Sequence, residues 1–218
     1  MFKGIVFDFD GVVVDSHAVH VLAWKKFLAS VGKSASEEQL QFILDGRKRE
    51  DILRHFLGEL DVTELAAYGS RKEKIFRTEA ASIGTIQGVL EFLEDVNRAQ
   101  LTLAIASSGS RSRVDLLLRQ LDLGRHFQVI VTGDEVERGK PDPAVFLKAA
   151  QDLRIIPTEL VAFEDALSGV KAAKAAGMKC VAIAESDRAS VLLNAGADHV
   201  LPNFRGLSYA KLRQLFVR

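Results

Sequence analysis

The sequence predicts an α/β fold in which a doubly wound parallel sheet carries an inserted α-helical segment. Two observations support this prediction. Short apolar runs rich in β-branched residues alternate along the chain with helical patterns, and one long segment near the N-terminus contains helical patterns alone. Continuous apolar runs suit strands that are covered on both faces, and strands that alternate with helices usually form a parallel sheet.

The strands of the sheet are expected at six short runs. They are residues 4–9, 101–106, 128–131, 160–163 and 179–184, with 199–201 as a short edge strand. Apolar residues at helical spacing lie between these runs, at residues 89–96, 114–121, 145–153 and 170–174. The last helix is expected to end at Gly177, because glycine commonly follows the end of a helix.

Residues 16–81 break this alternation. They contain three or four amphipathic helical patterns, at about 17–31, 36–45, 49–58 and 62–80, with no strand pattern between them. A connection between a strand and a helix usually has only about 2–6 residues. We therefore expect a core made of residues 1–15 and 82–218, and a helical cap made of residues 16–81.

The composition narrows the classes of function. Lys and Arg together number 29, as do Asp and Glu, so no basic surface for nucleic acid or for a membrane is indicated. No apolar stretch reaches the roughly 18 residues that span a bilayer, and the N-terminus lacks the pattern of a signal peptide. The single cysteine, Cys180, is expected to be a small buried hydrophobic residue on a strand. We expect a cytoplasmic protein, and a monomer because no coiled-coil pattern is present.

Polar residues follow the first four expected strands. The four sets are Asp8 with Asp10, Ser107 to Ser110, Lys140 in the loop beyond the third strand, and Glu164 with Asp165. Ligands of an open parallel sheet bind at the carboxyl ends of its strands. The four sets are therefore expected to lie at one edge of the sheet.

Asp8 and Asp10 would face the same way if the strand continues through both, because residues i and i+2 of a strand share a face. Like charges at short range repel each other, and burial adds a desolvation cost. A cation removes this conflict, and oxygen ligands without His or Cys point to Mg²⁺. Ser107, the amides that follow it at Ser108 and Gly109, and Lys140 could then hold a phosphoryl group.

Each set also has a simpler explanation. Asp165 could cap the helix that begins near Ala166, Ser107 could begin a turn that leads into a helix cap, and Lys140 could be an ordinary loop lysine. Asp8 and Asp10 are the hardest to explain in this way, because strands disfavour aspartate. The presence of all four sets at one predicted edge favours phosphoryl chemistry.

Four short segments, in this order, make the chain resemble the haloacid dehalogenase superfamily of aspartate-dependent phosphotransferases. They are "DFDGVVVDS", "IASSGS", "GKPDPAVF" and "FEDALSG". The resemblance covers essentially the whole chain and implies a Rossmann-type core with a cap that closes over the active site. Its first and last motifs are specific, whereas the second is weak by itself.

The resemblance implies a role for each core residue. Asp8 matches the nucleophile that forms an aspartyl-phosphate, and Asp10 matches the general acid and base. Ser107 and Lys140 match the residues that hold the phosphate. The Mg²⁺ site is matched by Asp8, Asp165 and the backbone carbonyl of Asp10, with Glu164 in support, directly or through water.

The helical segment resembles more closely that of the beta-phosphoglucomutase-like branch. Its matching residues are His20, Trp24, Arg49 and Lys72, which the resemblance implies couple cap closure to Asp10 and bind the distal phosphate of the substrate. His20 and Trp24 could equally be packing partners one helical turn apart, and Arg49 and Lys72 could be solvated.

The chain also departs from the mutase pattern at two places. A lysine that contacts phosphate in the mutase is replaced by Ser110 followed by Arg111, and a proline before glycine is replaced by Gln87 before Gly88. The leading hypothesis is therefore a Mg²⁺-dependent phosphatase that acts on a small phosphorylated metabolite, with a sugar phosphate as the expected substrate. The alternative is a beta-phosphoglucomutase that interconverts beta-glucose 1-phosphate and glucose 6-phosphate, and a third hypothesis is a binding protein without catalytic activity.

Overall fold

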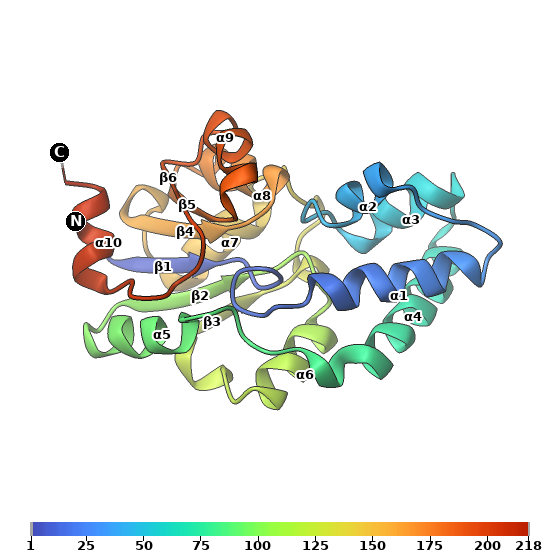
Figure 1. The fold of residues 1–218 in the computed structure, drawn as a ribbon, viewed down its shortest axis with the longest axis horizontal. Helices are drawn as coiled ribbons and strands as arrows, with labels where there is room; N and C mark the ends of the chain where they lie inside the picture. The colour runs from blue at the N-terminus through green and yellow to red at the C-terminus, as the bar shows by residue number, and fades with distance from the viewer. Residues whose placement is uncertain (1, 218) are drawn as a thin grey trace.

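A computed structural model describes residues 2–217 of the chain (Figure 1). Its centre is a parallel sheet in the order β3-β2-β1-β4-β5-β6. The strands are β1 (Gly4–Phe7), β2 (Thr102–Ala106), β3 (Val129–Val131), β4 (Leu160–Glu164), β5 (Lys179–Ile183) and β6 (His199–Leu201). The predicted doubly wound sheet is confirmed. After β1 the chain adds β2 and β3 on one side of this strand and then β4, β5 and β6 on the other.

The first strand is shorter than predicted. It ends at Phe7, although the apolar run continues to Phe9. The chain then turns sharply, because the amides of Val13 and Val14 donate back to the carbonyl of Phe9 and Gly11 adopts a φ of 78°. This turn matters for the site, since Asp10 no longer belongs to the strand.

The two faces of the sheet pack against two sets of helices. Side chains alternate along each strand, so that Ile5 and Phe7 face one core and Val6 faces the other. The first core includes α5 (Val89–Arg98), α6 (Arg111–Gln120) and α10 (Tyr209–Leu215), and the second includes α7 (Ala144–Leu153), α8 (Leu167–Ala175) and α9 (Ser186–Asn194). Both faces are therefore covered, which explains why the strands are mostly apolar.

Four helices fill the segment between β1 and α5. They are α1 (His17–Ala29), α2 (Glu37–Ile43), α3 (Arg49–Leu57) and α4 (Val62–Glu79), and Figure 1 shows them gathered beyond the carboxyl ends of the strands. They share a small apolar cluster of their own that includes Trp24, Phe27 and Leu53. Because α1 and α4 also pack against the main core, for example through Phe76, the helical segment is anchored beside the site.

Within residues 2–217, no helix combines the length and the apolar character that a membrane crossing requires. Cys180 lies buried on β5, as predicted, and burial raises the pKa of its thiol.

Candidate active site

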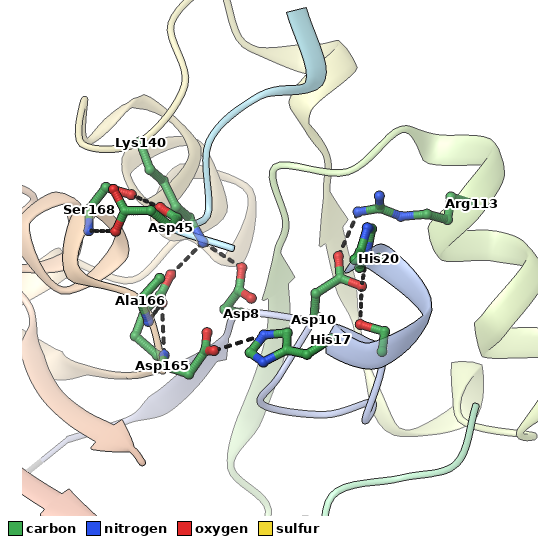
Figure 2. A network of polar contacts seen from close by, with 12 residues as sticks. Asp8, Asp10, His17, His20, Asp45, Arg113, Lys140, Asp165, Ala166 and Ser168 are labelled. Atoms are coloured by element: carbon green, nitrogen blue, oxygen red, sulfur yellow. Dashed lines mark hydrogen bonds and ion pairs between the residues drawn. The ribbon is translucent and has the colours of Figure 1, made fainter. Parts of the chain in front are cut away.

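Asp8 lies at the carboxyl end of β1, in the middle of the sheet. Its amide donates to the carbonyl of Phe163 on β4 at 2.8 Å, so the neighbouring strand fixes its backbone. The carboxylate is buried, and its Oδ1 lies 2.5 Å from Nζ of Lys140 (Figure 2). Burial raises the pKa of Asp8 well above its usual range, and the ammonium group of Lys140 opposes that shift.

Lys140 is completely buried between two acids. Its Nζ lies 2.5 Å from Oε1 of Glu164 and donates to the carbonyl of Ala106 at 3.1 Å. Burial alone would lower the pKa of Lys140, but the carboxylates of Asp8 and Glu164 outweigh it and raise this pKa above its usual range. Lys140 is therefore an internal counter-ion of the acidic site and not a solvated loop lysine.

Three buried carboxylates meet at this edge of the sheet. Asp8, Glu164 and Asp165 each offer one oxygen, and these oxygens lie within 4.8 Å of one another. A donor set made of carboxylate oxygens fits Mg²⁺. Asp10 is predicted as a further metal residue, but its carboxylate does not join this group. The backbone carbonyl of Asp10, which the resemblance implies as a ligand, is then its remaining candidate donor to the metal.

Glu164 already has several partners. Its Oε2 accepts from the amides of Asp165 at 2.9 Å and Ala166 at 3.1 Å, while Oε1 contacts Lys140. The carboxylate packs against Gly169 of α8 so closely that a Cβ at this position would overlap it. These contacts favour a supporting role for Glu164, because few of its lone pairs remain for a metal.

Asp10 has a different set of partners from Asp8. Its Oδ1 accepts from Oγ of Ser16 at 2.6 Å and lies 3.1 Å from Nε2 of His20, and its Oδ2 lies 2.5 Å from Nη2 of Arg113. Figure 2 shows the carboxylate of Asp10 turned toward His20 and Arg113, and that of Asp8 turned toward Lys140. Burial would raise the pKa of Asp10, but Arg113 and His20 hold it well below its usual range.

The two aspartates therefore do not crowd together as a continuous strand would require. The strand ends before them, and each carboxylate has its own cation, Lys140 for Asp8 and Arg113 for Asp10. The conflict expected from the sequence is resolved by the turn after β1 and by protein side chains on both sides.

The segment after β2 forms a tight loop at the same edge. The amide of Ser107 donates to the carbonyl of Val131 on β3, and the amide of Gly109 donates to Oγ of Ser107 at 3.0 Å. Ser108, Gly109 and Ser110 line the cavity above Asp8. The hydroxyl of Ser108 is buried and has no hydrogen-bond partner among residues 2–217, so it is available to a ligand.

The four residues predicted from the helical segment all line the same cavity as Asp8 and Asp10. Nζ of Lys72 lies 3.3 Å from Nδ1 of His20, and it also lies over the rings of Trp24 and Phe76. Burial and the charge of Arg113 lower the pKa of Lys72 to about 7, and burial and Lys72 lower that of His20 to about 3. A neutral His20 that accepts at Nδ1 carries its proton at Nε2, from which it can donate to Asp10.

Arg49 enters the cavity from the start of α3. Its Nη2 lies 2.6 Å from Oε1 of Glu50, and its guanidinium packs against Gly69 of α4. Arg111, at the place where the mutase pattern differs, instead pairs with Asp115 on the exposed side of α6.

The loop between α2 and α3 touches the core directly. Asp45 accepts from the amide and the hydroxyl of Ser168 at the start of α8, and Nζ of Lys48 donates to the carbonyl of Val136 at 2.9 Å. The cavity beside this loop, which opens partly to solvent, has a volume of about 70 Å³. That is room for about five water positions, enough for a phosphate group but not for a hexose phosphate.

Three residues of the site were not among those predicted. Arg113 and Ser16 hold Asp10, and His17 places its Nε2 3.0 Å from Oδ2 of Asp165, which raises the pKa of His17 to about 9 against the effect of burial. Ser16 is the last residue of the segment "DFDGVVVDS" and His17 follows it, so their position directly after the turn that ends β1 could have indicated them. Arg113 lies one turn into the helix after the second motif, where a residue can face the same crevice.

Comparison with known proteins places this site in a family. The profile of the haloacid dehalogenase-like hydrolase family matches residues 5–183. A phosphorylated carbohydrates phosphatase of Thermotoga maritima is 34% identical over 199 residues, which cover 89% of this chain and 92% of that protein. A beta-phosphoglucomutase of Mycobacterium bovis is 31% identical over 242 residues, with coverages of 94% and 91%.

The fold agrees with these relatives. A crystal structure of beta-phosphoglucomutase from Clostridium difficile superposes with a TM-score of 0.88 and covers 99% of this chain and 97% of that chain, at 22% identity. The sequence match and the shared architecture lead to one conclusion: the chain belongs to the haloacid dehalogenase-like hydrolase family, in its beta-phosphoglucomutase-like branch.

Proposed function

We propose that this protein is a Mg²⁺-dependent phosphatase that acts on a small phosphorylated metabolite, a sugar phosphate above all, through an aspartyl-phosphate on Asp8. The observation that carries the proposal is the setting of Asp8, a buried carboxylate beside Lys140 and within 4.8 Å of carboxylate oxygens of Glu164 and Asp165. The name of the Thermotoga maritima relative, a phosphatase of phosphorylated carbohydrates, supports the class of substrate.

The first half-reaction transfers the phosphoryl group to the protein. A carboxylate oxygen of Asp8 attacks phosphorus, and the bond from phosphorus to the ester oxygen breaks. Asp10 gives a proton to the departing alcohol, and it must take up that proton beforehand, because Arg113 and His20 hold its pKa low. Lys140, together with Ser107 and the loop that follows it, balances the charge of the phosphoryl oxygens.

The second half-reaction returns the protein to its starting state. Asp10 takes a proton from water, the water oxygen attacks phosphorus, and the bond to Asp8 breaks as inorganic phosphate forms. Arg113 and His20 keep the pKa of Asp10 low, which supports a carboxylate that can accept a proton in this step.

The metal belongs to the same proposal. Asp8, Asp165 and the backbone carbonyl of Asp10 would hold Mg²⁺, with Glu164 in support, and the donor set fits this ion. When bound, Mg²⁺ supplies positive charge to the transferring phosphoryl group.

The helical segment is proposed to act as a cap, with residues 1–15 and 82–218 as the catalytic core. The contacts of Asp45 and Lys48 with the core hold the loop between α2 and α3 beside the cavity. Movement of the cap away from the core would widen this cavity for a sugar phosphate. Four residues of the helical segment line this cavity and would contact and select the leaving group of the substrate: His20, Trp24, Arg49 and Lys72.

A beta-phosphoglucomutase is the second candidate, and the Mycobacterium bovis relative favours it. It would use the same first half-reaction and pass the phosphoryl group to a sugar hydroxyl in place of water. A binding protein without activity is disfavoured, because Asp8, Asp10 and Asp165 line one cavity and Lys140 contacts Asp8 there.

One experiment separates these possibilities. The purified protein with Mg²⁺ is incubated with a panel of phosphorylated sugars and other metabolites, and free phosphate is measured. In parallel, formation of glucose 6-phosphate from beta-glucose 1-phosphate is measured with a bisphosphate primer. Phosphate release supports the phosphatase, whereas rapid isomerisation without phosphate release would refute it in favour of the mutase. No turnover of any compound would support the inactive binding protein.

Asp8→Asn tests the nucleophile. It should abolish either activity, because an amide cannot form the acyl phosphate. Asp15→Asn, which changes an exposed aspartate of the same segment, should keep the activity and serves as the matched control. A fully active Asp8→Asn protein would refute the mechanism.

A further inference from the structure

Arg113 reaches the site from the first turn of α6. Its side chain is 90% buried, and its Nη2 lies 2.5 Å from Oδ2 of Asp10 (Figure 2). Ser16 and His20 both hold the other oxygen of Asp10, Oδ1. Rotation about the Cβ–Cγ bond moves both oxygens of a carboxylate. The contact with Arg113 therefore adds a restraint at the second oxygen to the one that Ser16 and His20 impose at the first.

The guanidinium of Arg113 is itself held in place by two other parts of the chain. It packs over the ring of Phe76 of α4, 5.4 Å from the ring centroid. It also lies directly against Gly109 of the loop after β2, where a Cβ would overlap Nη2. The absence of a side chain at Gly109 therefore makes room for the contact between Arg113 and Asp10.

Phe76 of α4 contacts two of the three donors of Asp10, His20 and Arg113. Its ring lies 4.6 Å from that of His20 and also contacts the guanidinium of Arg113. A displacement of α4 would therefore change the support of Oδ1 and of Oδ2 together.

We propose that Arg113 is a positioning residue, which fixes the orientation of the Asp10 carboxylate and couples it to α4 through Phe76. The inference rests on the proposed role of Asp10 as acid and base. Arg113 acts through Asp10 and not on the phosphoryl group. Its Nε is buried without a hydrogen-bond partner among the residues described, so direct binding of substrate is the competing role that the test must separate.

The test compares Arg113→Met, Arg113→Lys and Arg119→Met, the last of which removes an exposed arginine from the same helix. Each protein is assayed with two phosphate esters. The leaving group of p-nitrophenyl phosphate departs without a proton, whereas the more basic leaving group of phenyl phosphate depends more strongly on receiving a proton. We expect Arg113→Met to lower kcat/KM for phenyl phosphate by about 10- to 100-fold, the usual cost of a misplaced acid. The loss with p-nitrophenyl phosphate should be about threefold or less.

The conservative variant gives a second readout. Arg113 contacts Asp10 through one nitrogen, so a lysine can replace that contact, and Arg113→Lys should recover at least tenfold of a hundredfold loss. Arg119→Met should match the wild type. Equal losses with the two esters, no recovery by lysine, or a raised KM with an unchanged kcat would each overturn the positioning role, the last in favour of substrate binding.

A crystal structure of Arg113→Met tests the orientation without any assay. It should show the Asp10 carboxylate rotated or in two orientations, and an unchanged Asp10 would overturn the inference. A separate variant, Asp10→Asn, tests the proposed role of Asp10 as acid and base. If Asp10→Asn keeps full activity with both esters, Asp10 is not the acid and base, whatever Arg113 does to its orientation.

Discussion

Removal of the Lys140 charge should destabilise the protein strongly. In Lys140→Met the buried carboxylates of Asp8 and Glu164 lose the cation that lies 2.5 Å from each. Each pair is worth about 7 kcal/mol at an effective dielectric constant of about 20, and desolvation of the charges offsets most of this energy. Breaking a buried pair by removing one partner costs about 3–5 kcal/mol in measured cases.

The expected loss of unfolding free energy corresponds to a fall in the melting temperature, Tm. For a chain of this size, 1 kcal/mol corresponds to about 2–4 °C, so Tm should fall by roughly 6–20 °C. The measurement is thermal unfolding followed by circular dichroism in EDTA, with urea unfolding to obtain the free energy. Lys148→Met, which breaks an exposed pair with Asp152 on α7, is the matched control and should cost less than about 0.5 kcal/mol.

Two further measurements sharpen this prediction. Mg²⁺ should raise the Tm of Lys140→Met more than that of the wild type, because the carboxylates then lack their internal counter-ion. Addition of Glu164→Gln to Lys140→Met should recover part of the lost stability, since one uncompensated charge disappears. If Lys140→Met in EDTA unfolds within about 2 °C of the wild type, the account of Lys140 as an internal counter-ion is wrong.

Two other predictions concern Lys72 and Gly169. Burial and Arg113 lower the pKa of Lys72 to about 7, so between about pH 7 and pH 10 the unfolded chain binds more protons and the free energy of unfolding should rise with pH. Lys72→Met should remove that rise and should stabilise the protein at pH 6 by at most about 5 kcal/mol. The measurement is urea unfolding from pH 6 to pH 9.5. A difference in free energy of unfolding between Lys72→Met and the wild type that does not change with pH would contradict this prediction. Gly169→Ala should lower the free energy of unfolding by about 1–3 kcal/mol, because its Cβ overlaps the Glu164 carboxylate. Gly124→Ala is the control and should lower it much less in the same assay, because the space around its Cβ is open. Equal losses for the two variants would contradict the packing argument.

The sequence contained enough information for most of the fold. Apolar runs buried on both faces located every strand of the sheet, because the parallel pairing leaves no polar face to break the pattern. The helical patterns of residues 16–81 matched α1 to α4 within a few residues. The end of β1 was misplaced, because Phe9 is as apolar as a strand residue and only the turn at Gly11 shows where the pairing stops.

The candidate site was predictable only in part. The carboxyl ends of parallel strands meet at one edge, so the four polar sets could be brought together without coordinates. Arg113 could not be found in this way, since its contact with Asp10 spans 103 positions and depends on the space left by Gly109. His17 was also missed, because its partner Asp165 follows β4, far away in the sequence, and a sequence shows no spatial neighbours.

The pair Asp8 and Asp10 shows how local backbone geometry can divide two identical groups between two tasks. Lys140 lies against Asp8, in a buried set of carboxylates that suits a metal and a phosphoryl group. Two residues later the chain has left the sheet, and Asp10 meets an arginine and a histidine that keep it ionised. Had β1 continued to residue 10, both carboxylates would share one face and compete for the same cation. The turn that follows Phe7 thus separates the proposed nucleophile, Asp8, from the proposed acid and base, Asp10.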